Sequence, residues 1–206
     1  RLRGLVVRVR VVVVTLGREL LREKALLAVE RDAVVAHRHL GLLQIRTRGG
    51  MRGPFNTWLR SPELADRLQK VGESVRYNTS LDKRLNEMAI CMTAQHWGSQ
   101  YEWYAHAPLA LKAGLDPAVL KAIGEGRKPD TMKEDEAIVW EFTTQLRRDH
   151  SVDDATYARA MEKFGERGIL DLIAVNGYYD VVSMTLNVAR ASPPAGETMP
   201  FKQAGR

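Results

Sequence analysis

The sequence of 206 residues contains a single cysteine, Cys91. One cysteine excludes an internal disulfide, a CxxC redox pair and a cysteine-rich zinc site. No uninterrupted apolar run approaches the roughly 20 residues of a membrane-spanning helix. The chain also lacks a Gly-rich phosphate loop and a GxSxG motif. With 45% hydrophobic and 27% charged residues, the composition is that of an ordinary globular protein.

Residues 1–50 lack aromatic residues, Pro, Met, Ser and Asn. Their ten Arg, one Lys and four acids give this segment a charge of +7, whereas residues 51–206 are close to neutral. The net charge of +6 is therefore no argument for nucleic-acid binding by the whole chain. We expect residues 1–50 to be an atypical Arg/Val-rich extension, disordered or non-native, with a true start near Met51. A targeting segment and a basic arm for nucleic acid or anionic lipid are the alternatives.

Helical signals follow one another from residue 51 onward. Ser61 followed by Pro62 is typical of a helix start, and Ser80 is a candidate cap of the next helix. The patterns predict seven helices, over about 62–77, 81–97, 100–113 (kinked at Pro108), 117–124, 133–148, 151–164 and 169–189. We therefore predict an all-α domain over residues 51–200. The last helix is apolar nearly all round, which favours a subunit interface.

Glu87 lies in a helix that is apolar on most of its surface. Ile90, Cys91 and Ala94 share its stripe at 100° per residue. A carboxylate among small apolar neighbours has its pKa raised by desolvation, so Glu87 is a candidate acid. A solvent-facing glutamate is the alternative. Cys91 is expected to be an inert core residue.

Glu102 and His106 stand four residues apart on the next predicted helix. A glutamate at this spacing can orient the imidazole for acid–base chemistry, although such pairs also occur as solvated contacts. Ser99, Tyr101 and Tyr104 lie nearby and could donate hydrogen bonds to an anion or an enolate oxygen. Hydroxyls near a helix start are also common as caps.

A metal site is not predicted. His96, Glu102 and His106 lie within eleven residues, but Gly98 places an expected turn between the first two, and the spacing is not HExxH. We expect neither a metal nor another cofactor.

Several short motifs together resemble the carboxymuconolactone decarboxylase family. They are Arg52-Gly53-Pro54-Phe55, Ser61-Pro62-Glu63-Leu64-Ala65, Leu85 to Glu87, Tyr101-Glu102-Trp103-Tyr104-Ala105-His106, Gly114-Leu115, Gly177-Tyr178-Tyr179 and Leu186-Asn187. The resemblance covers residues 52–200, and YEWxxH in its helical context is its most specific part. Residues 1–50 do not resemble the family.

The wider superfamily includes alkylhydroperoxidase D, with a site of Glu, eleven residues, Cys-x-x-Cys, three residues and His. Laid on this chain, that spacing places the acid on Glu87 and the imidazole on His106, but the two cysteine positions fall on Ser99 and Glu102. Neither serine nor glutamate can form the disulfide of a thiol peroxidase. The departure argues against peroxidase activity and leaves an acid–base set.

The resemblance implies an all-α fold of the alkylhydroperoxidase D type and cofactor-free decarboxylation of a lactone acid in aromatic-compound breakdown. In this reading His106 is the proton donor, Glu102 orients it, and Glu87 is a raised-pKa acid or proton relay. Arg76 or Arg84 would hold the substrate carboxylate, unless both are surface charges. Ser99, Tyr101 and Tyr104 are weaker substrate-binding candidates.

The expected partner is a small organic acid or lactone, without nucleic acid or membrane. The resemblance further implies a homo-oligomer, a trimer or hexamer, and we expect a cytoplasmic location. An alkylhydroperoxidase-like peroxidase and a non-catalytic helical oligomer or binding module are the alternative functions.

Overall fold

The computed structural model describes residues 53–205. These residues form seven helices and no strand, which confirms the predicted all-α fold of about seven helices. The helices are α2 (Phe55–Trp58), α3 (Pro62–Tyr77), α4 (Lys83–His96), α5 (Gln100–Lys112), α6 (Pro117–Gly124), α7 (Glu134–Asp149) and α8 (Asp154–Val188). The expectations for residues 1–50 lie outside the described residues.

The chain divides into two compact units. Residues 58–66 belong to one unit, whereas residues 53–57 and 67–205 belong to the other. The larger unit holds α4 to α8 and the second part of α3, and it contains all the candidate site residues.

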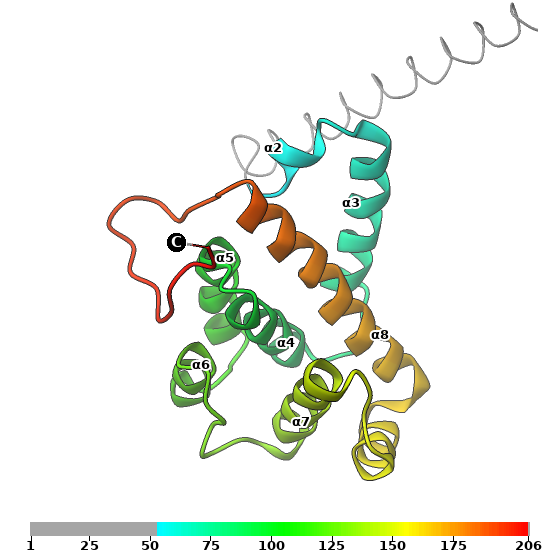
Figure 1. Ribbon diagram of the computed structural model, residues 1–206. Helices are drawn as coiled ribbons and strands as arrows, with labels where there is room; N and C mark the ends of the chain where they lie inside the picture. Colours follow the sequence, from blue (N-terminus) through cyan, green and yellow to red (C-terminus); the bar gives the residue numbers. More distant parts are fainter. Residues whose placement is uncertain (1–52, 206) are drawn as a thin grey trace, which may run out of the picture. The chain divides into compact units, whose positions relative to one another are not determined.

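Helix α4 is the central element of the larger unit. It contacts α5, α6, α7 and α8, which lie around it in Figure 1. Met88, Ala89, Ile90, Cys91 and Ala94 are completely buried. A helix that is apolar nearly all round is expected to be enclosed by other helices, and α4 is.

Aspartates begin three of these helices. Asp82, Asp116 and Asp153 accept hydrogen bonds from backbone N–H groups in the first turns of α4, α6 and α8. The cap of α4 is thus Asp82 and not Ser80, whose backbone N–H and hydroxyl both donate to Asp171.

Helix α8 differs from the prediction, because the two helices expected over 151–164 and 169–189 run into one another. The chain bends at Gly165, whose φ of 67° is accessible to glycine at little cost. Of the apolar positions that favoured an interface, Leu172, Val175, Val182 and Leu186 are buried within the chain's own core. The short helix α2 was not predicted.

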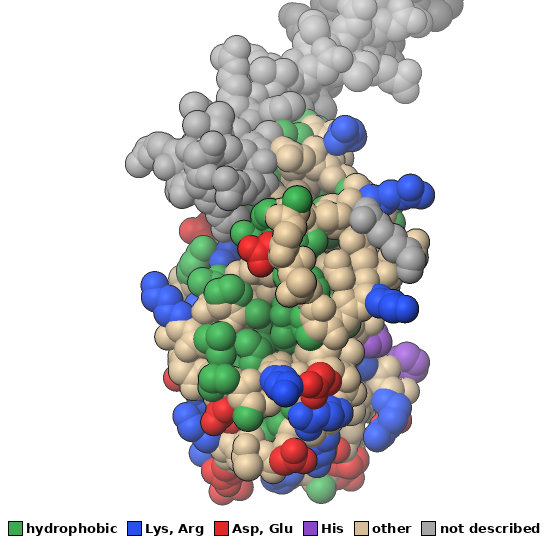
Figure 2. Space-filling view, turned by 90° about the vertical axis from the view of Figure 1, so that its left-hand side faces the viewer, with side chains coloured by type: hydrophobic (Ala, Val, Ile, Leu, Met, Phe, Trp, Pro, Cys, Tyr) green, Lys and Arg blue, Asp and Glu red, His purple; other side chains and the backbone are tan. Residues whose placement is uncertain are grey.

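Some large apolar side chains of α8 remain exposed, among them Leu170, Ile173, Met184 and Val188. By length and composition alone α8 could span a membrane, but core helices pass the same test and α8 packs against α4 and α7. Figure 2 shows one face of the molecule, where hydrophobic side chains gather in the middle and charged ones lie mainly below them.

The residues after α8 return to the turn between α4 and α5 (Figure 1). Gln100 donates to the carbonyl oxygen of Phe201 at 2.6 Å, and the Phe201 ring meets Trp103 edge to face at 5.3 Å. The backbone N–H of Ala204 donates to the carbonyl oxygen of Gly98. These contacts hold the start of α5, where Glu102 lies.

Candidate functional site

His106 lies between two carboxylates in the interior of the larger unit. Its Nδ1 is 2.6 Å from Oε2 of Glu87, and its Nε2 is 3.3 Å from Oε2 of Glu102. Glu87 is 0% exposed, and Glu102 and His106 are each 4% exposed. The structure therefore brings the three predicted acid–base residues together, and we call them the Glu87–His106–Glu102 cluster.

Two neighbouring helices position this cluster. Glu102 and His106 are one turn apart on α5, so their side chains share a face. Glu87 comes from α4, which turns back into α5 at Trp97, Gly98 and Ser99. Gly98 has a φ of 56°, and a Cβ there would lie 2.9 Å from the backbone nitrogen of Ala204. This turn sets Glu87 and His106 opposite each other.

The expected raised pKa of Glu87 is wrong. Burial alone would raise it, but the hydrogen bond and charge of His106, followed by those of Lys83, outweigh burial and lower the pKa below its usual value. Lys83 lies one turn earlier on α4, with its Nζ 2.8 Å from Oε1 of Glu87. Because an ionised carboxylate can only accept hydrogen bonds, the Nδ1–H of His106 donates to Glu87.

Tyr179 from α8 completes the surroundings of the imidazole. Its ring meets the His106 ring edge to face at 5.0 Å, and it is 2% exposed. Burial raises the pKa of the Tyr179 hydroxyl well above its usual value, and the charges of Glu102 and Glu87 act in the same direction. The hydroxyl is therefore protonated, and it can donate a hydrogen bond near the cluster.

Arg76 of α3 interacts electrostatically with Glu87 and Glu102 of this cluster. Burial by itself would lower its pKa, but Tyr179 and Tyr77 together with the two acids hold it above the usual value. Its Nε is buried without a hydrogen-bond partner among the described residues. Of the two arginines proposed for an anionic substrate, Arg76 is the one that is electrostatically coupled to the cluster.

Arg84 is engaged elsewhere. Its guanidinium donates to Asp135 at 2.6 Å and to Glu136, both at the start of α7. The side chain is largely buried in these ion pairs, so the alternative that Arg84 is a surface charge is wrong. Arg84 ties the beginning of α4 to the beginning of α7, and the placement does not favour a substrate-binding role.

The hydroxyl candidates lie in different places. Ser99 is 1% exposed, its Oγ has no hydrogen-bond partner among the described residues, and it caps no backbone group. It lies seven residues before His106, which is almost the same face of α5. Tyr101 and Tyr104 contact each other edge to face at 6.3 Å. Neither shares a face with His106, because Tyr104 precedes it by two residues and Tyr101 by five, about 160° and 140° away around the helix.

Cys91 is completely buried, and burial raises the pKa of its thiol well above the usual value. A thiol in such surroundings is unreactive. Within residues 53–205, no group of three or more His, Cys, Asp and Glu side chains is placed to hold a metal ion. The groups that the cluster offers are acids, a base and hydroxyls.

No role was predicted from the sequence for Tyr179 or Lys83. Tyr179 was noticed only as part of the Gly177-Tyr178-Tyr179 motif, and its meeting with His106 depends on the packing of α8. Lys83 had a local signal, because it precedes Glu87 by four residues on one helix. No protein-family model matches the chain, and no curated protein matches it either.

Proposed function

We propose that this protein is an enzyme resembling carboxymuconolactone decarboxylase, which decarboxylates a small lactone acid by acid–base chemistry without a cofactor. The observation that carries the proposal is the buried imidazole of His106 held between the carboxylates of Glu87 and Glu102. The resemblance in sequence supplies the reaction class. Breakdown of aromatic compounds is the proposed setting.

The geometry supports a division of labour between the two glutamates. Glu87 accepts the Nδ1–H of His106 at 2.6 Å and so fixes the ring and its tautomer. The Nε2 edge, with the longer separation of 3.3 Å to Glu102, is then the edge that exchanges a proton. Glu102, as a carboxylate, stabilises the imidazolium that donates, and after the reaction a proton taken up from water restores the imidazolium. Glu87 thus takes the orienting role that the sequence assigned to Glu102.

The proposed reaction balances without an electron acceptor from outside. The bond between the ring carbon and the carboxylate breaks, CO2 leaves, and the electron pair is delocalised into the unsaturated lactone as a dienolate. His106 then donates its Nε2 proton to carbon and becomes neutral. The hydroxyls of Ser99 and Tyr179 are candidate donors to the dienolate oxygen, since both are buried and protonated.

Arg76 is proposed to hold the substrate carboxylate at the entrance. The cluster itself is sealed, whereas Arg76 is half-buried and the side chain of Lys83 is 48% exposed. Substrate would therefore approach from the side of these two cations, and the anion would replace part of their present contacts. Arg76 interacts electrostatically with both Glu87 and Glu102, which are the two neighbours of His106.

The test is release of CO2 from carboxymuconolactone by the purified protein and three variants. His106→Ala should lower kcat by about 100-fold or more, the usual contribution of a positioned general acid. Glu102→Gln should lower kcat and move the pH optimum downward, because the imidazolium loses a neighbouring anion. Cys91→Ala should stay within a few-fold of the parent.

The decisive comparison is between His106→Ala and Cys91→Ala. An inactive cysteine variant beside an active histidine variant would refute the acid–base mechanism and revive a thiol peroxidase. A folded parent that turns over none of the lactone acids offered, and that none of them stabilises against heat, would favour the non-catalytic alternative. We further propose a cytoplasmic homo-oligomer without nucleic-acid or membrane partners.

A further inference from the structure

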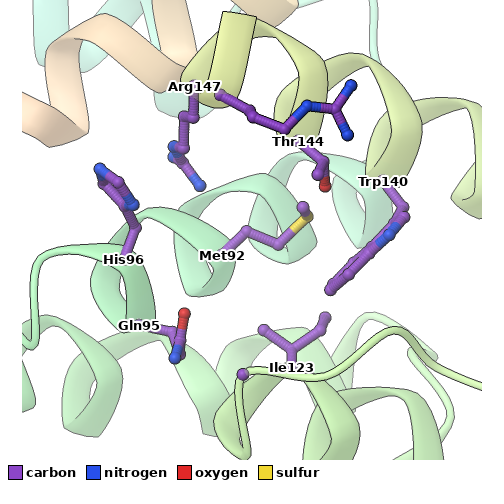
Figure 3. Close-up of a pocket in the computed structure, with 9 residues that line it drawn as sticks. Met92, Gln95, His96, Ile123, Trp140, Thr144 and Arg147 are labelled. Atoms are coloured by element: carbon purple, nitrogen blue, oxygen red, sulfur yellow. The ribbon is translucent and has the colours of Figure 1, made fainter.

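A pocket of about 300 Å³ opens between α4, α6 and α7 (Figure 3). None of its lining residues belongs to the Glu87–His106–Glu102 cluster. It is lined by Met92, Gln95 and His96 of α4, by Ile123 and Gly126, and by Trp140, Thr144, Arg147 and Arg148 of α7. His96 follows Glu87 by nine residues, about two and a half turns, so the two lie on opposite sides of α4. The volume is at the lower end of pockets that hold small organic ligands.

Arg147 is the unusual member of this lining. Its Nη2 donates to Oγ1 of Thr93 and, at 2.9 Å, to Oδ1 of Asn176, which are both neutral acceptors. Among the described residues, no carboxylate forms an ion pair with it, and its Nε is buried without a partner. A part-buried cation without an anion beside it has a cost, because the guanidinium has lost part of its hydration.

Burial lowers the pKa of Arg147 to about 10, and only the charge of Asp180 acts in the opposite direction. Asp180 is occupied as the acceptor of a 2.7 Å hydrogen bond from the indole N–H of Trp97. Asp180 therefore offsets the burial of Arg147 only from a distance. An anion in the pocket would supply the counter-charge that the described part of the chain does not place there.

The neighbouring Arg148 provides an internal comparison. It is exposed and binds Asp149 through two hydrogen bonds, of 2.8 and 2.6 Å. Its charge is therefore already balanced. In Figure 3 the guanidinium of Arg147 and the ring of His96 lie on one side of the pocket. Burial and the charge of Arg147 lower the pKa of His96, so near neutral pH its ring offers a hydrogen bond rather than a charge.

The rest of the lining is mostly apolar. The indole of Trp140 lies on the side of the pocket opposite His96, with Met92 between them and Ile123 below (Figure 3). An indole, a thioether and a branched alkyl group suit a flat apolar body. The side chains of Gln95 and Thr144 add polar groups that could orient it.

We propose that the pocket between α4, α6 and α7 binds a small organic monocarboxylate, whose carboxylate pairs with Arg147 and whose flat apolar body lies against Trp140 and Met92. One unpaired guanidinium suits one negative charge. This site is separate from the proposed catalytic cluster.

The probe is benzoate, measured by titration calorimetry and by the change in tryptophan fluorescence, since Trp140 lines the pocket. Benzyl alcohol keeps the ring without the charge, and inorganic phosphate keeps charge without the ring. We expect saturable binding of benzoate at millimolar concentration or below, and binding at least about tenfold weaker for both comparison ligands. Equal binding of phosphate would overturn the proposed ligand class. Equal binding of benzyl alcohol would remove the role of Arg147.

The matched variants are Arg147→Gln and Arg148→Gln, which remove neighbouring charges from the same helix. The first should weaken benzoate binding about tenfold or more, because it removes a charge-assisted hydrogen bond in a part-buried site. The second should change it by less than about threefold, since Arg148 is exposed and already paired. If both variants lost the same benzoate affinity, the effect would be one of surface charge, and the proposal that benzoate binds in this pocket would be refuted.

Two further variants test whether benzoate binds in this pocket and not in the catalytic cluster. Thr144→Leu fills the pocket without touching the hydrogen bonds of Arg147, and it should also weaken binding about tenfold or more if the pocket is the site. His106→Ala should leave benzoate binding unchanged, which separates this pocket from the catalytic cluster. Failure of the parent protein to bind benzoate, or binding that survives Thr144→Leu, would overturn the proposal and leave the proposed enzymatic function untouched.

Discussion

Replacing Glu87 by glutamine is the most direct perturbation of the buried cluster. The carboxylate accepts one hydrogen bond from His106 at 2.6 Å and lies 2.8 Å from Nζ of Lys83. Hydrogen bonds to a charged group contribute about 1.5–3 kcal/mol, and a half-exposed ion pair one helical turn apart about 0.3–0.5 kcal/mol. Glutamine keeps the shape and one acceptor, so we expect a loss of about 2 kcal/mol at neutral pH.

A loss of this size lowers the melting temperature by roughly 4–8 °C for a chain of about 200 residues. Thermal and urea unfolding, followed by circular dichroism at neutral pH, would measure it. Lys83→Met is the comparison variant, because it removes the half-exposed ion pair with Glu87 and the hydrogen bond from Nζ to the carbonyl oxygen of Arg76. Lys83 makes both contacts from a half-exposed side chain, so that variant should lose about 1 kcal/mol or less, clearly less than Glu87→Gln.

The dependence on pH gives a second, independent check of the same reasoning. The folded protein lowers the pKa of Glu87 below its usual value of 4.5, so near that pH the unfolded chain binds more protons than the folded one. The stabilisation by Glu87 is complete above pH 4.5 and is lost as the pH falls through the lower, folded value. The difference between the parent and Glu87→Gln should therefore shrink in acid. A difference that stays constant, or a glutamine variant that is the more stable, would refute the proposed charge on Glu87.

Two other predictions concern binding and assembly. Arg76→Gln should raise KM for a lactone acid about tenfold and change kcat much less, because it removes a charge that holds substrate and not the proton donor; an unchanged KM in steady-state kinetics would count against that role. The exposed Leu170 and Ile173 of α8 should be covered by a second copy of the chain, so light scattering should give a multiple of 23.2 kDa. The double substitution of Leu170 and Ile173 by Glu should shift the mass toward 23.2 kDa, and a monomeric parent would contradict this prediction.

The helices could be predicted because their signals are local. Pro62 and Pro117 occupy the first turns of α3 and α6, and Asp116 and Asp153 lie where caps are expected. The prediction was wrong at Gly165, where it placed a break between two helices and the structure has one helix with a bend. A glycine between two helical stretches is compatible with either outcome. Which of the two occurs depends on how the parts of α8 before and after Gly165 pack in the larger unit.

Within the site, the pair of Glu102 and His106 was visible because four residues make one helical turn. The link from Glu87 to His106 was visible only through the superfamily spacing, since it crosses the turn at Gly98. Tyr179 and Arg76 reach the cluster from other helices, and no periodicity in the sequence fixes such distances. The raised pKa expected for Glu87 failed for the same reason: burial could be inferred, but the partners that outweigh it could not.

The Glu87–His106–Glu102 cluster and the pocket of Arg147 lie on opposite sides of α4 and differ in how their charges are paired. This difference affects what each region can do. In the cluster, Glu87 has a cation or an N–H at each oxygen, and the surroundings of His106 are closed to solvent. Buried ion pairs of this kind add little stability compared with well-packed apolar side chains, so stability alone is a weak reason to build one. The proposed proton transfer would give a reason to build one. In the pocket of Arg147 the opposite holds, because no carboxylate within residues 53–205 forms an ion pair with the guanidinium and the space beside it is open. That region is suited to hold an anion, because its lining offers the guanidinium of Arg147 and the imidazole of His96 but no carboxylate.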